Sequence, residues 1–484
     1  TAVHNLLEND PGGLDSGRKE YIAITTIKVA VIVWILILFS TSLPLVYNND
    51  VLTYHWANIS DYLNRGSISV NHYNIYSYFP QNAELIYLWQ FMLNSEMSAR
   101  MFNFAIWVLL IFAIIAFVKR SSDSWSGWVA GGLFAFAPLI LIESYTPKND
   151  LTVALYSFLS ILTLAGCFPD SKTSNLFEKE AVGQKPDQSP NTKHLFLSGM
   201  LMGAALGTKY TALPQLGVSV LAMAFVFYMR AKSSLTTTLK YIGIFLCGAL
   251  IFSSLWYMRN IYLTGNPIYP FASRLIPTLF QSEWHKNIAD TITDAAALDS
   301  YLRTPKQFLA AILGTSIETG AWLSPFIVLF LIYLYVLHKL KNRYLVYCFW
   351  LALLPLFIGL INLMQIRMFI ANLCAIIAVV SICIGYSIFR NSYIRVAISL
   401  GIILYLLSPP NIPAFSYIDA GLCSILNGED PINLPLSLST KDAVLVNELE
   451  TIKRFADNNL PKNACILFVG ERRSARFRRR FYAS

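Results

Sequence analysis

The chain has 484 residues, of which 55% are hydrophobic and only 13% are charged, and its mean hydropathy is +0.50. Soluble globular proteins carry about 25% charged residues. The composition therefore excludes an ordinary soluble enzyme and predicts an all-α polytopic membrane protein. The net charge of +9 does not indicate a nucleic-acid partner, because its densest cluster lies in a C-terminal tail that we expect outside the cytoplasm.

Apolar runs recur along the chain at roughly the 17–25 residues that cross a bilayer. We predict about eleven transmembrane helices, near 23–45, 98–118, 125–143, 151–167, 195–208, 212–229, 240–256, 322–338, 345–362, 368–389 and 394–408. Basic clusters fall on one side of this arrangement, at 119–120, 230–232, 339–343 and 390–395. The positive-inside rule then places residues 1–22 in the cytoplasm as an N-terminal tail.

These spans divide the chain into a transmembrane domain over 23–408 and an external tail over 409–484. Three longer polar segments interrupt the domain: a first external loop at 46–97, a cytoplasmic insert at 170–194 and an external segment at 257–321, in which Asp290–Phe308 is expected to be partly helical. The tail contains a helix-like run at 441–458 and a strand-like run at 464–469, which predicts a small α/β unit.

The first external loop begins with an amphipathic pattern. Leu52, Trp56, Ile59 and Leu63 share one helical face, and Asp50, Tyr54 and Asp61 share the opposite face. We predict an interfacial helix over 51–64 with its apolar side toward the membrane. Gly66 is expected to cap it, and a second helix is expected over 83–93.

The stretch from Trp256 to Phe271 is aromatic and turn-rich and carries a single cation, Arg259. Gly265 tolerates positive φ and Pro267 lacks an amide donor, so the preceding helix should stop here. An arginine at headgroup depth is suited to bind a phosphate, because its planar guanidinium matches phosphate oxygens. This favours an enzyme acting on a lipid-linked phosphate over a channel.

Six ionisable residues from distant segments are expected at the same external depth. They are Asp50, Glu143, Asp150, Lys209, Arg259 and Arg367. Charge near the hydrocarbon is costly unless it is paired or functional. Local alternatives exist for these residues taken singly: a lone cation can snorkel to the interface, and Asp50 can cap a helix. Of their neighbours, His55 can make a structural hydrogen bond and Tyr54 can belong to the interfacial aromatic belt. Convergence of the six ionisable residues on one outward cavity is the functional interpretation.

In such a cavity the cations Lys209, Arg259 and Arg367 would neutralise a leaving phosphate. Asp50 would take the proton of the attacking acceptor, with Asp150 or Glu143 as a helper, a metal ligand or an acceptor clamp. Tyr54 and His55 are further candidate substrate contacts. The chain has no Gly-rich phosphate loop, so a nucleotide-sugar donor is not indicated.

The order of these motifs resembles the GT-C superfamily of membrane glycosyltransferases, in its branch that uses polyprenyl-phosphate sugars and includes mannosyltransferase-like and aminoarabinose-transferase-like members. The resemblance spans about residues 23–408. Its markers are Asp50–His55, Pro147–Asp150, Gly207–Tyr210, Trp256–Phe271 and Arg367. It implies that Asp50 is the catalytic base, that Asp150 is the second external acidic residue and that Arg367 contacts the lipid phosphate. Many members have paired acids in the first loop, whereas this chain has Asn49 before Asp50.

The resemblance implies inverting sugar transfer from a polyprenyl-phosphate donor to an external acceptor, which is a lipid, a glycan or a protein. The enzyme would lie among the lipids of a bacterial inner membrane with its site facing outward. The alternative is a catalytically silent GT-C-like subunit of a membrane complex. A transporter ranks last, because the charges gather at one face and no inverted repeat is apparent.

The sequence gives few indications of cofactors or protein partners. No Cys/His cluster has metal-ligand spacing, so no metal residues are predicted, and a divalent ion is left open without being indicated. Cys423 and Cys465 of the seven cysteines lie in the external tail, either as a disulfide or as free thiols. Six arginines between Arg472 and Arg480 fit a contact with anionic headgroups or a protein complex, or a solvated domain end.

Overall fold

A computed structural model describes most of the transmembrane part of the chain and small pieces of the tail. The described residues are 11–40, 50–72, 74–93, 96–168, 190–272, 275–276, 343–361, 369–386, 392–406, 458–459, 466–468 and 481–483. Predictions for the segments 170–189, 277–342 and 409–457 therefore lie outside the described residues, as do those for Arg367, Cys423, Cys465 and the arginine cluster.

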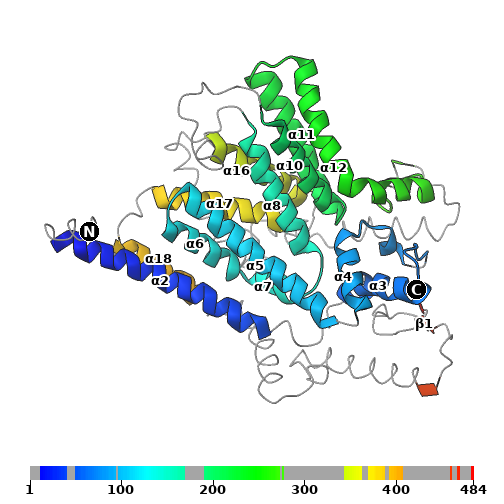
Figure 1. Cartoon of the computed structure of the whole chain (residues 1–484), viewed down its shortest axis with the longest axis horizontal. Helices are drawn as coiled ribbons and strands as arrows, with labels where there is room; N and C mark the ends of the chain where they lie inside the picture. Colours follow the sequence, from blue (N-terminus) through cyan, green and yellow to red (C-terminus); the bar gives the residue numbers. More distant parts are fainter. Residues whose placement is uncertain are drawn as a thin grey trace.

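The described part of the chain is predominantly helical (Figure 1). Its α-helices are α2 (Pro11–Phe39), α3 (Trp56–Arg65), α4 (Asn82–Met92), α5 (Glu96–Ser121), α6 (Ser124–Ala135), α7 (Pro138–Tyr145), α8 (Asp150–Gly166), α10 (Thr192–Leu206), α11 (Leu213–Met223), α12 (Leu235–Thr264), α16 (Arg343–Ile361), α17 (Ile370–Tyr386) and α18 (Ser392–Leu406). Shorter turns are η2 (Val51–His55), η3 (Ile75–Tyr78), η4 (Tyr210–Ala212) and η5 (Ala224–Arg230). Strands β1 (Ile466–Phe468) and β2 (Phe481–Ala483) pair in parallel.

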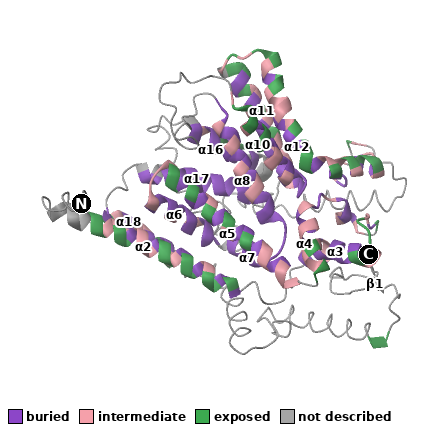
Figure 2. Ribbon diagram, in the orientation of Figure 1, coloured by how far each residue is buried: buried purple, intermediate pink, exposed green. Residues whose placement is uncertain are grey.

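Within the described residues, four stretches are long and apolar enough to cross a bilayer. They are Gly17–Phe39, Glu96–Ser121, Tyr210–Met229 and Leu235–Thr264. Exposed apolar side chains such as Leu36, Leu250 and Leu255 line the outer faces of α2 and α12, where soluble proteins carry polar residues (Figure 2). The chain is an integral membrane protein. The count of eleven spans stays a prediction, because 322–338 lies outside the described residues.

Two predicted spans differ from the structure. The span expected at 125–143 is broken into α6 and α7, because Pro138 lacks an amide donor and starts a new helix. The span expected at 240–256 continues to Thr264, so Arg259 lies inside α12 near its end and not beyond it. Gly265, with φ of 77°, caps α12 in the left-handed conformation, and the predicted stop is confirmed.

The centre of the helical domain is α17, whose side chains from Phe369 to Val380 are almost all buried. A helix that is apolar on every side is stable only inside a bundle or a membrane, and α17 packs on α5, α6, α8 and α16. Its one buried amide, Asn372, donates to Gln215 of α11 at 2.9 Å and to the Ala352 carbonyl of α16 at 2.9 Å. These bonds fix how α17 is rotated against its neighbours.

Helices α10 and α12 run parallel in very close contact. A Cβ atom at Gly199 would lie 2.0 Å from the Phe245 carbonyl oxygen, and one at Gly203 would lie 2.0 Å from that of Ala249. Small residues at four-residue spacing allow this approach, as in other membrane helix pairs. The packing brings the ends of both helices, which carry Lys209 and Arg259, to the same side of the domain.

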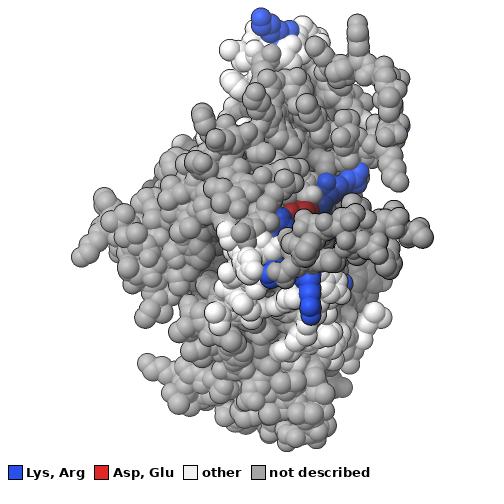
Figure 3. Space-filling model, turned by 90° about the vertical axis from the view of Figure 1, so that its left-hand side faces the viewer, with Lys and Arg blue, Asp and Glu red and all other residues white. Residues whose placement is uncertain are grey.

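Basic residues gather at the opposite side. Arg395 of α18 pairs with Glu20 of α2 and, at 2.8 Å, with Asp123 before α6. Figure 3 looks at this side and shows a small acidic patch directly against basic side chains. Lys119 at the end of α5 lies against Gly127 of α6. This end of the domain therefore carries paired charges, and its location on the cytoplasmic side stays a prediction.

The first external loop forms the expected helices but packs differently from the prediction. Gly66 caps α3 with φ of 65°. However, Leu52, Trp56 and Ile59 pack in the protein against Tyr87 of α4 and Ala99 of α5. The prediction of an apolar face resting on the membrane is wrong for these residues, because α4 and α5 supply a protein surface that covers it. Leu63 alone of the four is exposed.

Candidate functional site

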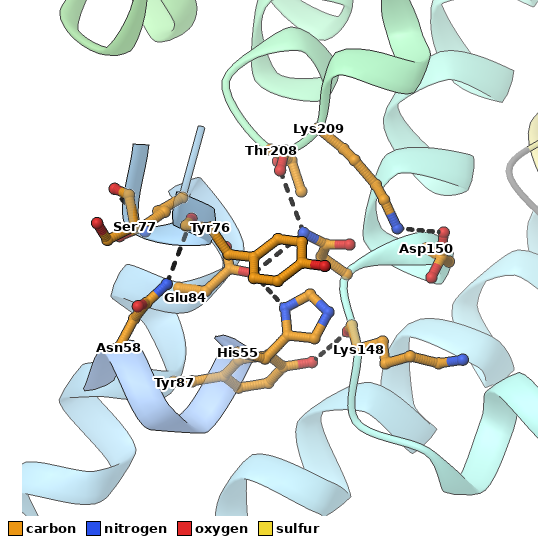
Figure 4. A network of polar contacts seen from close by, with 12 residues as sticks. His55, Asn58, Tyr76, Ser77, Glu84, Tyr87, Lys148, Asp150, Thr208 and Lys209 are labelled. Carbon is orange, nitrogen blue, oxygen red and sulfur yellow. Dashed lines mark hydrogen bonds and ion pairs between the residues drawn. The ribbon is translucent and has the colours of Figure 1, made fainter. Parts of the chain in front are cut away.

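A buried polar network joins four segments at one end of the domain (Figure 4). His55 Nδ1 of η2 lies 2.6 Å from Glu84 Oε1 of α4. Asn149, directly before α8, donates to the same Glu84 oxygen at 3.0 Å and to the Thr208 carbonyl at 3.2 Å. All three side chains are at least nine-tenths buried. Such a network requires mutual hydrogen bonding, since unpaired buried polar groups are costly.

Two buried ion pairs adjoin this network. Lys209 Nζ, just after α10, lies 2.7 Å from Asp150 Oδ1 at the start of α8. Lys148 Nζ lies 2.9 Å from Glu143 Oε1 of α7. The Lys209 side chain keeps 11% of its surface exposed, whereas that of Lys148 keeps 3%. Lys209 is therefore the more accessible of these two cations.

The turn between α7 and α8 is held by hydrogen bonds to its backbone. Asn103 of α5 donates to the carbonyl oxygens of Glu143, Ser144 and Thr146 at 2.8, 3.0 and 3.1 Å. The Tyr87 hydroxyl of α4 donates to the Lys148 carbonyl at 2.7 Å. A turn that would otherwise bury unpaired carbonyls is satisfied in this way, and Asp150 is held at the first turn of α8.

Asp50 and Tyr54 lie on the turn that ends in His55. Asp50 precedes η2 in helical backbone conformation and makes no capping hydrogen bond, so the capping alternative does not apply. The Tyr54 ring stacks on Tyr76 with centroids 4.5 Å apart and lies 4.1 Å from the His55 ring. A π-helical turn such as η2 is rare and occurs frequently at functional sites.

Arg259 faces the loop before α4. Its Nη2 donates to the carbonyl oxygens of Ser77 at 3.2 Å and Phe79 at 3.4 Å, and its guanidinium lies 4.9 Å from the Trp256 ring centre. The neighbouring Asn260 donates to the Tyr78 carbonyl at 2.8 Å. The end of α12 thus holds this loop through its backbone.

Two tyrosines report the charges around them. Burial raises the pKa of Tyr62 to about 12; the Glu84 and Asp61 carboxylates add to the rise, while Arg259 and the hydrogen bond to Gln81 oppose it. Burial also raises the pKa of Tyr87, and Glu84 and Asp150 both push it further in the same direction. Tyr62 therefore lies within the fields of Arg259 and Glu84, and Tyr87 within those of Glu84 and Asp150.

The structure thus brings Asp150 and Lys209 together directly, and it places His55 beside Glu84 and Tyr54 beside His55. Glu143 lies near the end of α7, just before the turn to α8, and pairs with Lys148. Sequence reasoning missed Glu84, Asn149 and Lys148 as contributors. Glu84 carried a signal, because it is the one carboxylate in the apolar run Ala83–Leu93. Among the described residues, no group of three or more His, Cys, Asp or Glu side chains is placed to hold a metal ion.

Comparison with solved structures identifies the fold. The chain matches ArnT from Cupriavidus metallidurans bound to undecaprenyl phosphate with a TM-score of 0.56 and 13% identity, over 95% of this chain and 85% of that one. It matches the Archaeoglobus fulgidus oligosaccharyltransferase tethered to an acceptor peptide with a TM-score of 0.51 and 14% identity, over 95% of this chain and 64% of that one. No protein-family model and no curated protein sequence matches the chain. The chain shares the fold of these two structures, so the fold implied by the resemblance is confirmed.

Proposed function

We propose that this protein is a membrane glycosyltransferase that moves a sugar from a polyprenyl-phosphate donor to an acceptor, with inversion at the anomeric carbon. The observation that carries the proposal is the Asp150–Lys209 pair, a nearly buried cation held 2.7 Å from a carboxylate beside the His55–Glu84 pair. The ArnT structure of the same fold was obtained bound to undecaprenyl phosphate, which supports a lipid-phosphate donor.

In this mechanism the acceptor oxygen or nitrogen attacks the anomeric carbon from the side opposite the phosphate. Asp50 accepts the acceptor proton as the new bond forms. The bond between the anomeric carbon and the phosphate oxygen breaks, and the polyprenyl phosphate leaves with the electron pair. Lys209 neutralises the growing phosphate charge, and Asp150 holds the ammonium in place.

The other candidate residues take supporting roles. Arg259 uses Nη2 to hold the loop at 77–79, and the rest of its guanidinium is proposed to face the phosphate. Glu143 is proposed to hold the turn before α8 through Lys148. Tyr54 stacks beside His55 and is proposed to contact the sugar. Arg367 remains a candidate phosphate ligand from the sequence.

The proposed setting is a bacterial inner membrane, with the site outside the cytoplasm. Its partners are the lipid-linked donor, an acceptor that is a lipid, a glycan or a protein, and the surrounding membrane lipids. The arginine-rich tail is proposed to contact anionic headgroups or a protein complex.

The test is transfer of radiolabelled sugar from a panel of undecaprenyl-phosphate sugars by the purified protein in liposomes with a cell-envelope acceptor extract. We expect the Asp50→Asn and Lys209→Ala variants to lose at least about 100-fold in transfer, the scale of removing one preorganised group. Lys193→Ala, an exposed lysine at the start of α10, is the matched control and should retain activity.

Loss of activity in a variant does not show that the donor lipid binds, so undecaprenyl-phosphate binding is measured alongside sugar transfer. We expect undecaprenyl phosphate to bind the unmutated protein and to bind Lys209→Ala more weakly. Absence of both transfer and undecaprenyl-phosphate binding by folded, unmutated protein would refute the proposal and favour the catalytically silent subunit.

A further inference from the structure

Glu84 makes a contact pattern that the proposed reaction does not use. A single carboxylate oxygen, Oε1, contacts side chains from two segments: His55 Nδ1 lies 2.6 Å away and Asn149 Nδ2 donates to it at 3.0 Å. Asn149 continues to the Thr208 carbonyl at 3.2 Å. Glu84 is 3% exposed and His55 is fully buried, so water does not compete for these bonds.

Apart from Glu84, each residue in this hydrogen-bonded series is adjacent in sequence to a candidate site residue. His55 follows Tyr54 and ends the turn that starts after Asp50, Asn149 precedes Asp150, and Thr208 precedes Lys209. The three segments come from η2, the start of α8 and the end of α10, and Figure 4 shows them around Glu84. A shift of any one of them relative to Glu84 would move a candidate site residue with it.

We propose that Glu84 is a positioning residue that sets the distance between the Asp50 turn and the Lys209–Asp150 pair. This inference rests on the proposed function for its effect on catalysis. Glu84 does not touch the substrate. A carboxylate suits this role, since hydrogen bonds to a charged acceptor are roughly twice as strong as neutral ones.

The alternative is that Glu84 only stabilises the fold. Asp61 provides a matched comparison, because it is another buried carboxylate of the same loop region, 2% exposed and bonded to Arg65 at 2.8 Å. Its ion pair with Arg65 lies within one turn of the same helix. Loss of either carboxylate should lower stability, but only loss of Glu84 should uncouple the site.

Hydrogen–deuterium exchange of the whole protein in detergent tests the coupling without any assay of activity. In Glu84→Ala we expect faster exchange in three separate peptides, covering 51–55, 148–150 and 206–209. His55→Ala should affect only the first, and Asn149→Ala only the other two. Asp61→Ala should leave exchange in the 148–150 and 206–209 peptides unchanged. Exchange that changes only within α4 in Glu84→Ala would overturn the proposal.

The kinetic test uses Glu84→Gln, which keeps the shape and one acceptor oxygen and so guards against a variant that does not fold. We expect Glu84→Ala to lower kcat about 100-fold with donor KM little changed, as misplacement of catalytic groups does. Glu84→Gln should recover a large part of that loss.

The double variant Glu84→Ala/Lys209→Ala should be no slower than Lys209→Ala within about threefold, because groups that act as a unit are not additive. Multiplicative losses, or an equal loss in Asp61→Ala, would overturn the proposal. Absence of transfer by the unmutated protein would refute the proposed function, and the exchange pattern would still decide whether Glu84 couples the segments.

Discussion

At the residue scale, the two lysine–carboxylate pairs differ in what surrounds them. Lys148 and Glu143 keep 3% and 2% of their side-chain surfaces exposed, whereas Lys209 keeps 11%. A fully enclosed pair cannot meet a ligand without opening, so its contribution is to the fold. The partly open pair can exchange a protein contact for a phosphate contact. Burial therefore separates the pair that we assign to the fold from the pair that we propose to contact the phosphate.

This separation gives an expectation for stability. Lys148→Ala leaves the Glu143 carboxylate buried without its cation and should lower the free energy of unfolding by about 3–5 kcal/mol. The double variant Lys148→Met/Glu143→Leu should cost clearly less than the sum of the single variants, because neither charge is then left unpaired. Thermal unfolding in detergent measures both. Lys193→Ala, an exposed lysine, is the control, and an equal cost there would contradict the argument.

Arg259 gives a second expectation at this scale. Its Nη2 contacts the Ser77 and Phe79 carbonyls, which a lysine cannot reproduce with one ammonium and a different geometry. Arg259→Lys should keep the positive charge, and with it most of the affinity for undecaprenyl phosphate, but loosen the loop at 75–81. Arg259→Ala should lose both the affinity for undecaprenyl phosphate and the contacts that hold the loop. We expect protease cleavage or hydrogen exchange of the loop to rise in both variants and lipid binding to fall about tenfold or more only in Arg259→Ala, consistent with loss of a charged contact. Equal lipid binding in all three proteins would exclude a phosphate contact.

At the element scale, the parallel packing of α10 on α12 places the two helix ends that carry Lys209 and Arg259. We expect Gly203→Ala to force these helices apart, because the new Cβ would lie 2.0 Å from the Ala249 carbonyl oxygen and backbone cannot move aside easily. The cost should be about 1–3 kcal/mol of stability, as for other overpacked sites, together with lower transfer activity.

The control for this substitution is Gly217→Ala in α11, where an added Cβ meets nothing within 4 Å. Alanine favours helix over glycine by up to about 1 kcal/mol, so Gly217→Ala should be neutral or stabilising. Thermal unfolding of the two variants side by side decides the matter. Equal stability of Gly203→Ala and the unmutated protein would show that the close approach is not needed.

The elements themselves were largely predictable from sequence because hydropathy is a local property. Apolar runs located α5, α8, α10 and α12, and Gly66 and Gly265 marked helix ends through their tolerance of positive φ. Packing was not local and was not predicted. The apolar face of α3 has the same pattern whether lipid or protein covers it, so sequence alone assigned Leu52, Trp56 and Ile59 to the membrane.

At the scale of the whole molecule, the sequence predicted which residues share a side but not which of them touch. Positive charge and span order put Asp50, Asp150, Lys209 and Arg259 at the same depth. Nothing in the sequence specified that Asp150 would pair with Lys209, because that contact depends on how α8 packs against α10 through Ser160 and Ser198. Glu84 was missed since its partners, His55 and Asn149, lie 29 and 65 positions away.

The same sidedness gives an expectation for the membrane orientation of the whole chain. Ser67, directly after α3, and Ser234, directly before α12, are both exposed. Ser67 lies in the loop region of the candidate site, and Ser234 lies at the far end of α12 from Arg259. If the basic side faces the cytoplasm, as the distribution of Lys and Arg predicts, only the site side is open to the exterior.

We therefore expect a single cysteine at Ser67 to react with a membrane-impermeant maleimide added to intact cells, and a single cysteine at Ser234 to react only after the membrane is permeabilised. Both variants would be made in a background whose seven native cysteines are replaced by serine or alanine. Labelling in detergent is the control that both thiols are accessible. The reverse pattern would place the Asp150–Lys209 pair on the cytoplasmic side, where the donor and acceptor assigned to it would have to be cytoplasmic as well. Orientation is thus a direct constraint on the substrates, because a site on one membrane face can use only the lipid headgroups presented there.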